Sequence, residues 1–327
     1  MRDAFNRTIE YLRVSVTDRC NFRCVYCMPP QGVEPLQHSQ ILSYEEILRI
    51  VTVLTKHGLK RVRLTGGEPL VRRGLIEFVR NLSAIRDLQD IALTTNGSLL
   101  APMAAELKQA GLNRVNISID TVNAELFHQI SGGGRVQDTL DGIEAALSVG
   151  LQPVKLNVVA TTYLTDADLA FFLNLARNRP VAVRFIEYMP IGYNTADVSI
   201  SISHLREKLT EIAGAALIPI QFPQGGGPAS YFTLPGMIGR LGFIAPISEH
   251  FCSSCNRIRL TADGKIKPCL LQNMEFDIKS QLRSGINDLQ LAQLLLQAVC
   301  LKPAGHELNS SGSADSAVTR QMSQIGG

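Results

Sequence analysis

The chain has 327 residues, of which 45% are hydrophobic and 19% charged, as in soluble globular proteins and unlike disordered chains. This length accommodates one large or two modest domains, which excludes a peptide hormone or a small disulfide-stapled scaffold. The formal net charge is only +3, so the composition does not indicate a nucleic-acid or membrane-surface binder. No apolar stretch is long enough to cross a membrane and no secretory leader is evident, so we expect a cytoplasmic protein.

Strand patterns alternate with helix patterns along the first part of the chain. We expect six strands there, at 11–17, 61–65, 90–95, 113–120, 154–160 and 181–187. Helix signals lie between them: capping boxes at Ser43 with Glu46 and at Thr165 with Asp168, Pro102 at a first-turn position, and an apolar run at 139–149. This alternation predicts parallel βαβ units. Without a glycine-rich dinucleotide fingerprint, a barrel or partial barrel is favoured over a Rossmann sheet.

Alternation within the strands is more informative than their existence. In the first strand Leu12 and Val14 share one face while Arg13 shares the other with Ser15, and later strands repeat the pattern. Parallel sheets normally bury both faces, so a polar face predicts a lined cavity. The cations on that face, which are Arg13, Arg63 and Lys155, are expected to meet an anionic ligand. The alternative is a set of strand ends whose long side chains reach solvent.

The pattern changes in the last third of the chain. We expect β-rich runs at 216–222, 229–234 and 239–245, then a cysteine-bearing hairpin, and helices at 276–282 and 288–301. The Ser/Gly-rich segment 309–317 is expected to be mobile. The predicted organisation is a barrel at 1–195, an extension at 196–308 and a mobile tail at 309–327.

Three cysteines lie in one short loop directly after the first predicted strand. They are spaced C-x3-C-x2-C and are Cys20, Cys24 and Cys27. Three thiolates so close together can hold one [4Fe-4S] cluster, which leaves one iron open to a non-protein ligand. The alternative is a zinc site that a distant histidine completes.

A second group of three cysteines is spaced C-x2-C-x13-C across the predicted hairpin and consists of Cys252, Cys255 and Cys269. Three ligands imply either a second cluster with an open iron or a zinc ion with a fourth ligand such as His250. Arg257 and Arg259 alternate with Ile258, so both arginines share one strand face beside this group. The alternative for that face is simple solvation.

The first cysteine loop, with Tyr26 before its third cysteine, resembles the signature of the radical S-adenosylmethionine (SAM) enzymes. The turn Gly66-Gly67-Glu68-Pro69 after the second strand is a second mark of that family. The resemblance implies that the open iron binds SAM and that an electron from the cluster generates a 5′-deoxyadenosyl radical. The implied fold is α/β: a partial (βα)6 TIM-type barrel with a β-rich and helical C-terminal extension that carries a second iron–sulfur cluster.

The full pattern is similar to that of the GTP 3′,8-cyclases, which are radical SAM lyases. It rests on the segments 11–18, 63–69, 94–97, 116–120, 184–189, 251–257 and 326–327, and fades at 221–236 and 301–320. The resemblance implies two [4Fe-4S] clusters, SAM and GTP. It also implies the first step of molybdenum-cofactor biosynthesis: the ribose 3′ hydrogen is removed, and the carbon radical attacks C8 to give (8S)-3′,8-cyclo-7,8-dihydroguanosine 5′-triphosphate.

The same resemblance assigns roles to individual residues. The implied metal ligands are the six cysteines of the two groups, and the implied SAM contacts are Tyr26, Gly67, Ser118 and Met189. The implied GTP contacts are Arg13, Arg63, Thr94, Lys155, Arg257, Ile258 and Arg259. The implied catalytic residues are Arg257, Arg259 and the terminal Gly326 and Gly327, which reach into the active site.

Partners are implied in the same way: a low-potential electron donor such as flavodoxin or ferredoxin, cyclic pyranopterin monophosphate synthase as a pathway neighbour, and a homodimer. No nucleic acid and no membrane is expected. Two other functions remain open at this point. One is a radical SAM peptide-modifying enzyme with auxiliary clusters, although such enzymes usually carry more cysteines in the C-terminal half. The other is a non-catalytic iron–sulfur protein.

Several conspicuous residues receive no functional role. Cys300 lies in an apolar helix pattern and is expected to be a buried small hydrophobe. The glycine run 132–134 lacks the partners of a phosphate loop and is expected to be flexible. No metal spacing connects the remaining histidines, which are His38, His57, His128, His204 and His306.

Overall fold

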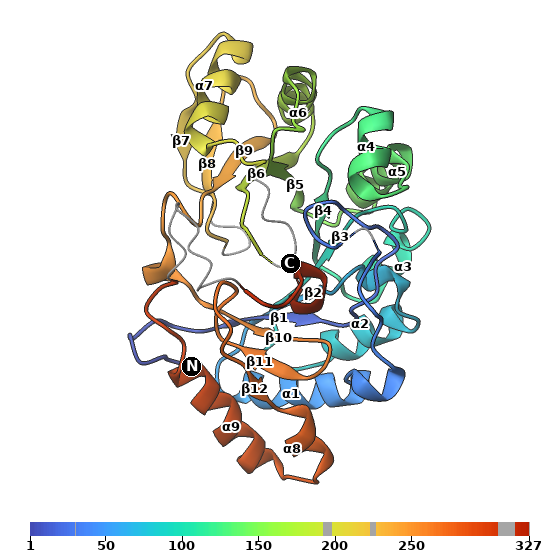
Figure 1. Cartoon of the computed structure of the whole chain (residues 1–327), viewed down its shortest axis with the longest axis vertical. Coiled ribbons are helices and arrows are strands. Elements are labelled where there is room, and N and C mark those ends of the chain that lie inside the picture. Colours follow the sequence, from blue (N-terminus) through green and yellow to red (C-terminus); the bar gives the residue numbers. More distant parts are fainter. Residues whose placement is uncertain (30, 192–197, 223–226, 307–317, 327) are drawn as a thin grey trace.

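The computed structural model describes residues 1–29, 31–191, 198–222, 227–306 and 318–326. Over these ranges one curved sheet runs through the molecule, and helices cover its outer side (Figure 1). The strand order is β12-β11-β10-β1-β2-β3-β4-β5-β6-β9-β8-β7. The predicted segment 309–317 and Gly327 lie outside the described residues.

The central six strands are parallel and follow one another in chain order. They are β1 (Tyr11–Ser15), β2 (Arg61–Thr65), β3 (Asp90–Thr95), β4 (Arg114–Ser118), β5 (Val154–Ala160) and β6 (Val181–Glu187). Four of them have the predicted bounds, while β1 ends two residues early and β4 is shorter at both ends. The α/β class and the partial barrel are therefore confirmed.

The helices between these strands pack their apolar faces against the sheet. They are α1 (Tyr44–Lys56), α2 (Leu75–Ser83), α3 (Ala104–Gln109), α4 (Ala124–Ser131), α5 (Val136–Ser148) and α6 (Asp166–Asn178). Both predicted capping boxes form; for example, Ser43 Oγ accepts from Glu46 N at 3.2 Å. The prediction for Pro102 is wrong, because α3 begins only at Ala104 and has Met103 as its N-cap.

The C-terminal part of the chain extends both edges of the sheet. Its strands are β7 (Ile218–Ile220), β8 (Ser230–Thr233), β9 (Arg240–Ile244), β10 (Arg257–Leu260), β11 (Lys265–Lys267) and β12 (Phe276–Asp277). Strand β9 pairs in parallel with β6, and β10 pairs in parallel with β1. The domain boundary at residue 195 stays a prediction, but strands from beyond it belong to the same sheet as the barrel strands.

Four helices accompany these strands: α7 (Ile202–Ala213), α8 (Lys279–Arg283), α9 (Asp288–Cys300) and α10 (Met322–Ile325). The predicted helix at 276–282 is wrong in its first residues, because Phe276 pairs with Ile266 as a strand and the Asp277 carboxylate accepts from Ser280 N. Helix α10 lies near the centre of the view, beside β2, close to the label that marks the C-terminus (Figure 1). None of the helices over the described ranges has the length and hydropathy of a membrane span.

Cys300 is exposed, so the prediction that it is buried is wrong. The buried side of α9 consists of Leu291, Leu295 and Val299 with their neighbours. At about 100° per residue, Cys300 lies on the opposite side of the helix from Leu291. The helical period alone therefore accounts for its exposure.

An aromatic cluster joins β9 to the barrel. Phe185 of β6 is fully buried, stacks on Phe243 of β9 with ring centroids 5.8 Å apart, and meets Phe172 of α6 edge to face at 6.4 Å. Aromatic contacts of this kind add to the stabilisation from apolar burial. This cluster ties the C-terminal extension to the sixth barrel strand.

We expect Phe185→Ala to lower the free energy of unfolding by about 3–5 kcal/mol, because it removes a large buried side chain that cannot be replaced by neighbouring groups. The measurement is the urea unfolding midpoint. Phe5→Ala is the control, since Phe5 is 54% exposed and its loss is expected to change stability by less than about 0.5 kcal/mol. Equal midpoints for the two variants would contradict the role of the cluster.

Candidate functional site

A row of arginines crosses the inner face of the sheet. The strand register pairs Arg13 of β1 with Arg259 of β10 on one side and with Arg63 of β2 on the other. Desolvation is the main cause that lowers the pKa of Arg63 and of Arg259 to about 10, and the charge of Arg257 contributes to the shift at Arg259. Such crowding of like charge is unfavourable in the folded chain alone and favours binding of an anion.

These arginines line a cavity at the inner face of the sheet. Among the described residues around it, six are Arg or Lys and none is Asp or Glu: the cations are Arg13, Arg63, Arg184, Arg257, Arg259 and Lys302. The buried Nε groups of Arg63 and Arg184 have no hydrogen-bond partner within the described chain. Buried donors without acceptors are rare in folded proteins, so the cavity is suited to a strongly anionic ligand.

Two of these cations were not singled out from the sequence. Arg184 lies on β6 opposite the buried Val183 and Phe185, so the same alternation that identified Arg13 could have identified it. Lys302 follows α9, where no periodic pattern indicates which side chains turn inward. Its Nζ donates to Pro268 O at 2.7 Å and holds it beside the second cysteine group.

Lys155 lies deeper on the same face of the sheet, at 1% exposure. Its register partner on β4 is Asn116, and its Nζ lies 5.4 Å from the centroid of the Phe222 ring and 5.8 Å from that of Tyr231. Desolvation first, and then the charge of Arg184, lowers the pKa of Lys155 to about 6. The inward cation predicted at this position is therefore present, although it does not line the cavity.

The first cysteine group lies in a loop after β1, and its three cysteines are half-buried. The N–H of Phe22 donates to the Cys20 sulfur at 3.3 Å, and the Tyr26 hydroxyl donates to the Asp120 carboxylate. Burial raises the pKa of Cys20 to about 11 and that of Cys27 to about 12. Three half-buried free thiols in one loop fit a metal cluster, since metal coordination supplies the positive charge that stabilises thiolates.

The glycine turn after β2 lies directly against this loop. Gly67 N donates to Thr17 O at 2.8 Å, and a Cβ at Gly67 would lie only 2.3 Å from the backbone oxygen of Arg19. No other residue fits there without a shift of the backbone before Cys20. The Glu68 carboxylate accepts from Asn96 N at 2.7 Å and from Leu70 N at 3.0 Å, although burial raises its pKa to about 7.

All three cysteines of the second group line the cavity. Burial would raise the pKa of Cys255, but the charges of Arg257 and Lys302 outweigh it and lower the value to about 7. His250, Cys252 and His306 hold their ligand atoms within 4.8 Å of one another. His306, which received no role from the sequence, therefore belongs to the second cysteine site. Both an iron–sulfur cluster and a zinc ion would have suitable ligand atoms at this site.

The end of the chain enters the interior between the two cysteine groups. Gly326 is buried, and its carbonyl accepts from Arg259 Nη1 at 2.6 Å. A Cβ at Gly326 would overlap the Thr65 hydroxyl at 2.1 Å, so only glycine fits. The structure thus places Gly326 at the arginine row.

The other residues implied by the resemblance divide into two sets. Met189 lines the cavity, as do the four arginines of the predicted GTP set. Thr94, Ser118, Tyr26 and Gly67 do not line it, although Thr94 and Ser118 lie on the neighbouring strands β3 and β4. Ile258 has no exposed side-chain surface because it points into the core from β10.

Comparison with family models identifies two regions of this chain. Residues 14–176 match the radical SAM superfamily, and residues 181–308 match the family described as Molybdenum Cofactor Synthesis C. A protein of Heliobacterium modesticaldum named GTP 3′,8-cyclase is 48% identical over 330 residues, which cover all of both chains. Proteins of the same name from Moorella thermoacetica and Listeria monocytogenes are 46% and 44% identical and match all of this chain. The chain belongs to the GTP 3′,8-cyclase family of radical SAM enzymes.

Solved structures confirm the fold. SuiB of Streptococcus suis bound to S-adenosylmethionine has a TM-score of 0.59 at 14% identity, over 83% of this chain and 63% of that chain. SuiB bound to its precursor peptide SuiA has a TM-score of 0.61 at 14% identity, over 81% of this chain and 60% of that chain. At this identity the likeness establishes the shared radical SAM architecture only.

Membership of the GTP 3′,8-cyclase family resolves the alternatives that the cysteine spacing left open. The cofactors of the family are SAM and two [4Fe-4S] clusters. A non-catalytic iron–sulfur protein and a peptide-modifying enzyme are not supported, because proteins named GTP 3′,8-cyclase match over the full length. The roles of the individual site residues stay predictions.

We expect Lys155→Met to stabilise the ligand-free protein. Since the pKa of Lys155 is lowered to about 6 in the folded chain and is about 10.4 in the unfolded chain, only the unfolded chain binds this proton between those pH values. This group therefore makes stability rise with pH across that window, and its cost is greatest at the acid end.

Urea unfolding of both proteins from pH 6.5 to 9 measures this effect. We expect the variant to gain more than about 1 kcal/mol at pH 6.5 and to lose part of the wild-type pH slope. Lys60→Met is the control, because Lys60 is largely exposed and lies 3.8 Å from Glu10. A wild-type slope retained in the Lys155 variant would contradict a deprotonating lysine.

Proposed function

We propose that this chain cyclises GTP to (8S)-3′,8-cyclo-7,8-dihydroguanosine 5′-triphosphate, the first step of molybdenum-cofactor biosynthesis. The observation that carries the proposal is the cavity itself: its described lining has five arginines and one lysine but no carboxylate, and includes the second cysteine group. A nucleoside triphosphate has the charge that such a cavity requires. The full-length similarity to proteins named GTP 3′,8-cyclase supports the same substrate.

Cys20, Cys24 and Cys27 would hold the first cluster, which together with SAM supplies the 5′-deoxyadenosyl radical. The backbone around Gly67 approaches this loop closely enough for a small ligand group to meet main-chain atoms there. We assign SAM contacts to Tyr26, Gly67, Ser118 and Met189. Of these, Met189 lies at the cavity wall and would separate the two halves of the site.

The triphosphate would lie along the arginine row. Guanidinium groups donate in pairs to phosphate oxygens, and the row Arg259, Arg13 and Arg63 presents three such groups on adjacent strands. We assign the further GTP contacts to Thr94, Lys155, Arg257 and Ile258. Since the strands are rigid, the row fixes the ribose relative to the radical source, and positioning is the main contribution of these residues.

Cys252, Cys255 and Cys269 line the cavity and would hold the second cluster, whose open iron would bind the base of the nucleotide. Arg7 supports this loop from outside: its Nη1 donates to Cys252 O at 2.8 Å and to Ala304 O at 2.9 Å. We assign catalytic roles to Arg257, Arg259, Gly326 and Gly327. Burial of Gly326 helps to exclude water, which protects a carbon radical from side reactions.

Two partners follow from the proposed reaction. A low-potential electron donor such as flavodoxin or ferredoxin would reduce the first cluster, and cyclic pyranopterin monophosphate synthase would consume the product. The homodimer and the cytoplasmic location stay predictions.

We expect Arg63→Ala to raise the KM for GTP at least about tenfold, because charge-assisted bonds to phosphate contribute roughly that much each. SAM binding is expected to stay within about twofold of wild type, since Arg63 lies away from the first cysteine loop on the cavity side. Product analysis of GTP and SAM consumption in the reduced enzyme measures both.

Arg61→Ala is the matched control for Arg63→Ala. Arg61 lies two residues earlier on the same strand and is ion-paired with Glu10 at 2.6 Å, outside the cavity. Its loss should leave the KM for GTP unchanged. Equal weakening of GTP and SAM binding in Arg63→Ala would contradict the assignment of the arginine row to the triphosphate.

A further inference from the structure

The last described residues, 318–326, form a segment that we call the C-terminal strap. The strap passes between the two cysteine groups. At one side the backbone N–H of Ser323 donates to the sulfur of Cys27. At the other side Ile325 is fully buried in a small cluster with Leu271, against which Cys269 packs. The strap therefore contacts both predicted metal sites.

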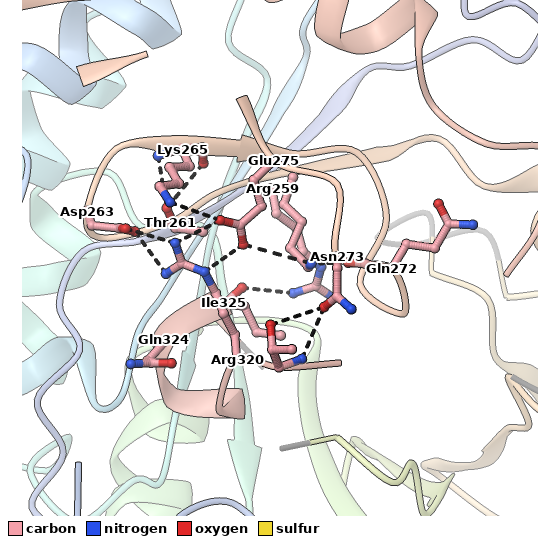
Figure 2. Close-up of polar contacts among 12 residues, drawn as sticks. Arg259, Thr261, Asp263, Lys265, Gln272, Asn273, Glu275, Arg320, Gln324 and Ile325 are labelled. Atoms are coloured by element: carbon pink, nitrogen blue, oxygen red, sulfur yellow. Dashed lines mark hydrogen bonds and ion pairs between the residues drawn. The ribbon is translucent and has the colours of Figure 1, made fainter. Parts of the chain in front are cut away.

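Arg320 fixes the beginning of the strap. Its guanidinium lies between two carboxylates, as Figure 2 shows: Nη1 and Nη2 donate to Asp263 at 3.1 and 2.8 Å, and Nε and Nη2 donate to Glu275 at 2.6 and 2.8 Å. The three side chains are only 13–19% exposed. A forked pair with two carboxylates in a half-buried setting is among the stronger polar contacts available to a protein surface.

The two carboxylates belong to the β10–β12 region, which also carries Arg259 of the arginine row and Cys269 of the second cysteine group. Asp263 lies in the turn between β10 and β11, and Glu275 directly precedes β12. From β10, Arg259 donates to the carbonyl oxygens of Ile325 and Gly326 at 3.3 and 2.6 Å. Figure 2 shows the bond to Ile325 beside the Arg320 contacts. The β10–β12 region thus holds the strap at both ends.

Only the second of these attachments lies at the proposed active site. Arg259 can hold Gly326 only if the strap returns to the same place each time, and the one-turn helix α10 between the two attachments is too short to be stable alone. Near the entry Thr319 N and Oγ1 donate to Asn273 Oδ1 at 3.0 and 3.3 Å, and both of these bonds are neutral. Arg320 supplies the charged attachment.

We propose that Arg320 is a positioning residue, which with Asp263 and Glu275 clamps the C-terminal strap so that Gly326 reaches the arginine row. The inference rests on the proposed cyclase function and adds to it the residues that place Gly326. Arg320 touches neither the cavity nor the cysteines, and it acts through the backbone of the strap.

The test compares Arg320→Ala with the wild-type holoenzyme, kept anaerobic and loaded with iron. Hydrogen exchange of the C-terminal peptide reports whether the strap is held, and iron content reports whether both cysteine groups are filled. Steady-state kinetics separate kcat from the KM for GTP. We expect exchange of that peptide to be at least about tenfold faster, kcat to fall at least about tenfold, and both iron content and KM to change less than about twofold.

Two further variants sharpen the result. Arg283→Ala is the matched control, because Arg283 of α8 forms a comparable forked contact with Glu46, at 2.7 and 3.1 Å, outside the strap. It should leave exchange of the C-terminal peptide and kcat unchanged. Arg320→Lys keeps the charge but not the fork, so intermediate values are expected.

Unchanged exchange of the C-terminal peptide in Arg320→Ala would overturn the proposal, and so would faster exchange with an unchanged kcat. If Arg320→Ala fails to fold, Glu275→Gln decides, since it weakens one partner and should change exchange and kcat in the same direction by a smaller factor. A wild-type protein that consumes no GTP would refute the proposed function instead, while the exchange measurement would still decide whether Arg320 holds the strap.

Discussion

The structure depends on one constraint: a parallel sheet carries a row of cations on its buried face. Charges are costly to remove from water unless a partner compensates them, and the cavity wall contains no carboxylate among its described residues. The cations on the inner face of the sheet therefore need an anionic ligand to compensate their charge. These cations lower the stability of the ligand-free protein, and they favour binding of an anion, as expected where function conflicts with folding.

The rest of the molecule is arranged around that row. The first cysteine loop and the glycine turn follow the C-terminal ends of β1 and β2, where ligands of parallel sheets bind. The C-terminal extension returns to pair β10 with β1, so Arg259 and the second cysteine group join the same surface. The strap then passes between the two cysteine groups, and the carbonyl oxygens of Ile325 and Gly326 accept hydrogen bonds from Arg259.

Local patterns predicted the parts of this arrangement that depend on period and spacing. The two-residue repeat of a strand placed Arg13, Arg63 and Lys155 on one face, and short cysteine spacings predicted the two metal loops. Contacts between distant segments could not be predicted this way. Lys302 and Arg320 act through partners far away in the chain, and neither lies in a periodic pattern. The exposure of Cys300, in contrast, could have been predicted from the sequence, because the helical period places it opposite the buried Leu291.

The most direct test of the central claim is anaerobic reconstitution, with iron and sulfide counted while GTP and SAM are followed to their products. The account predicts about eight irons per chain, the content of two [4Fe-4S] clusters, together with a cyclised GTP product. About four irons with one zinc, and SAM cleavage without consumption of GTP, would contradict this prediction. The radical SAM barrel would still be correct, but the anionic substrate of the cavity would not be GTP.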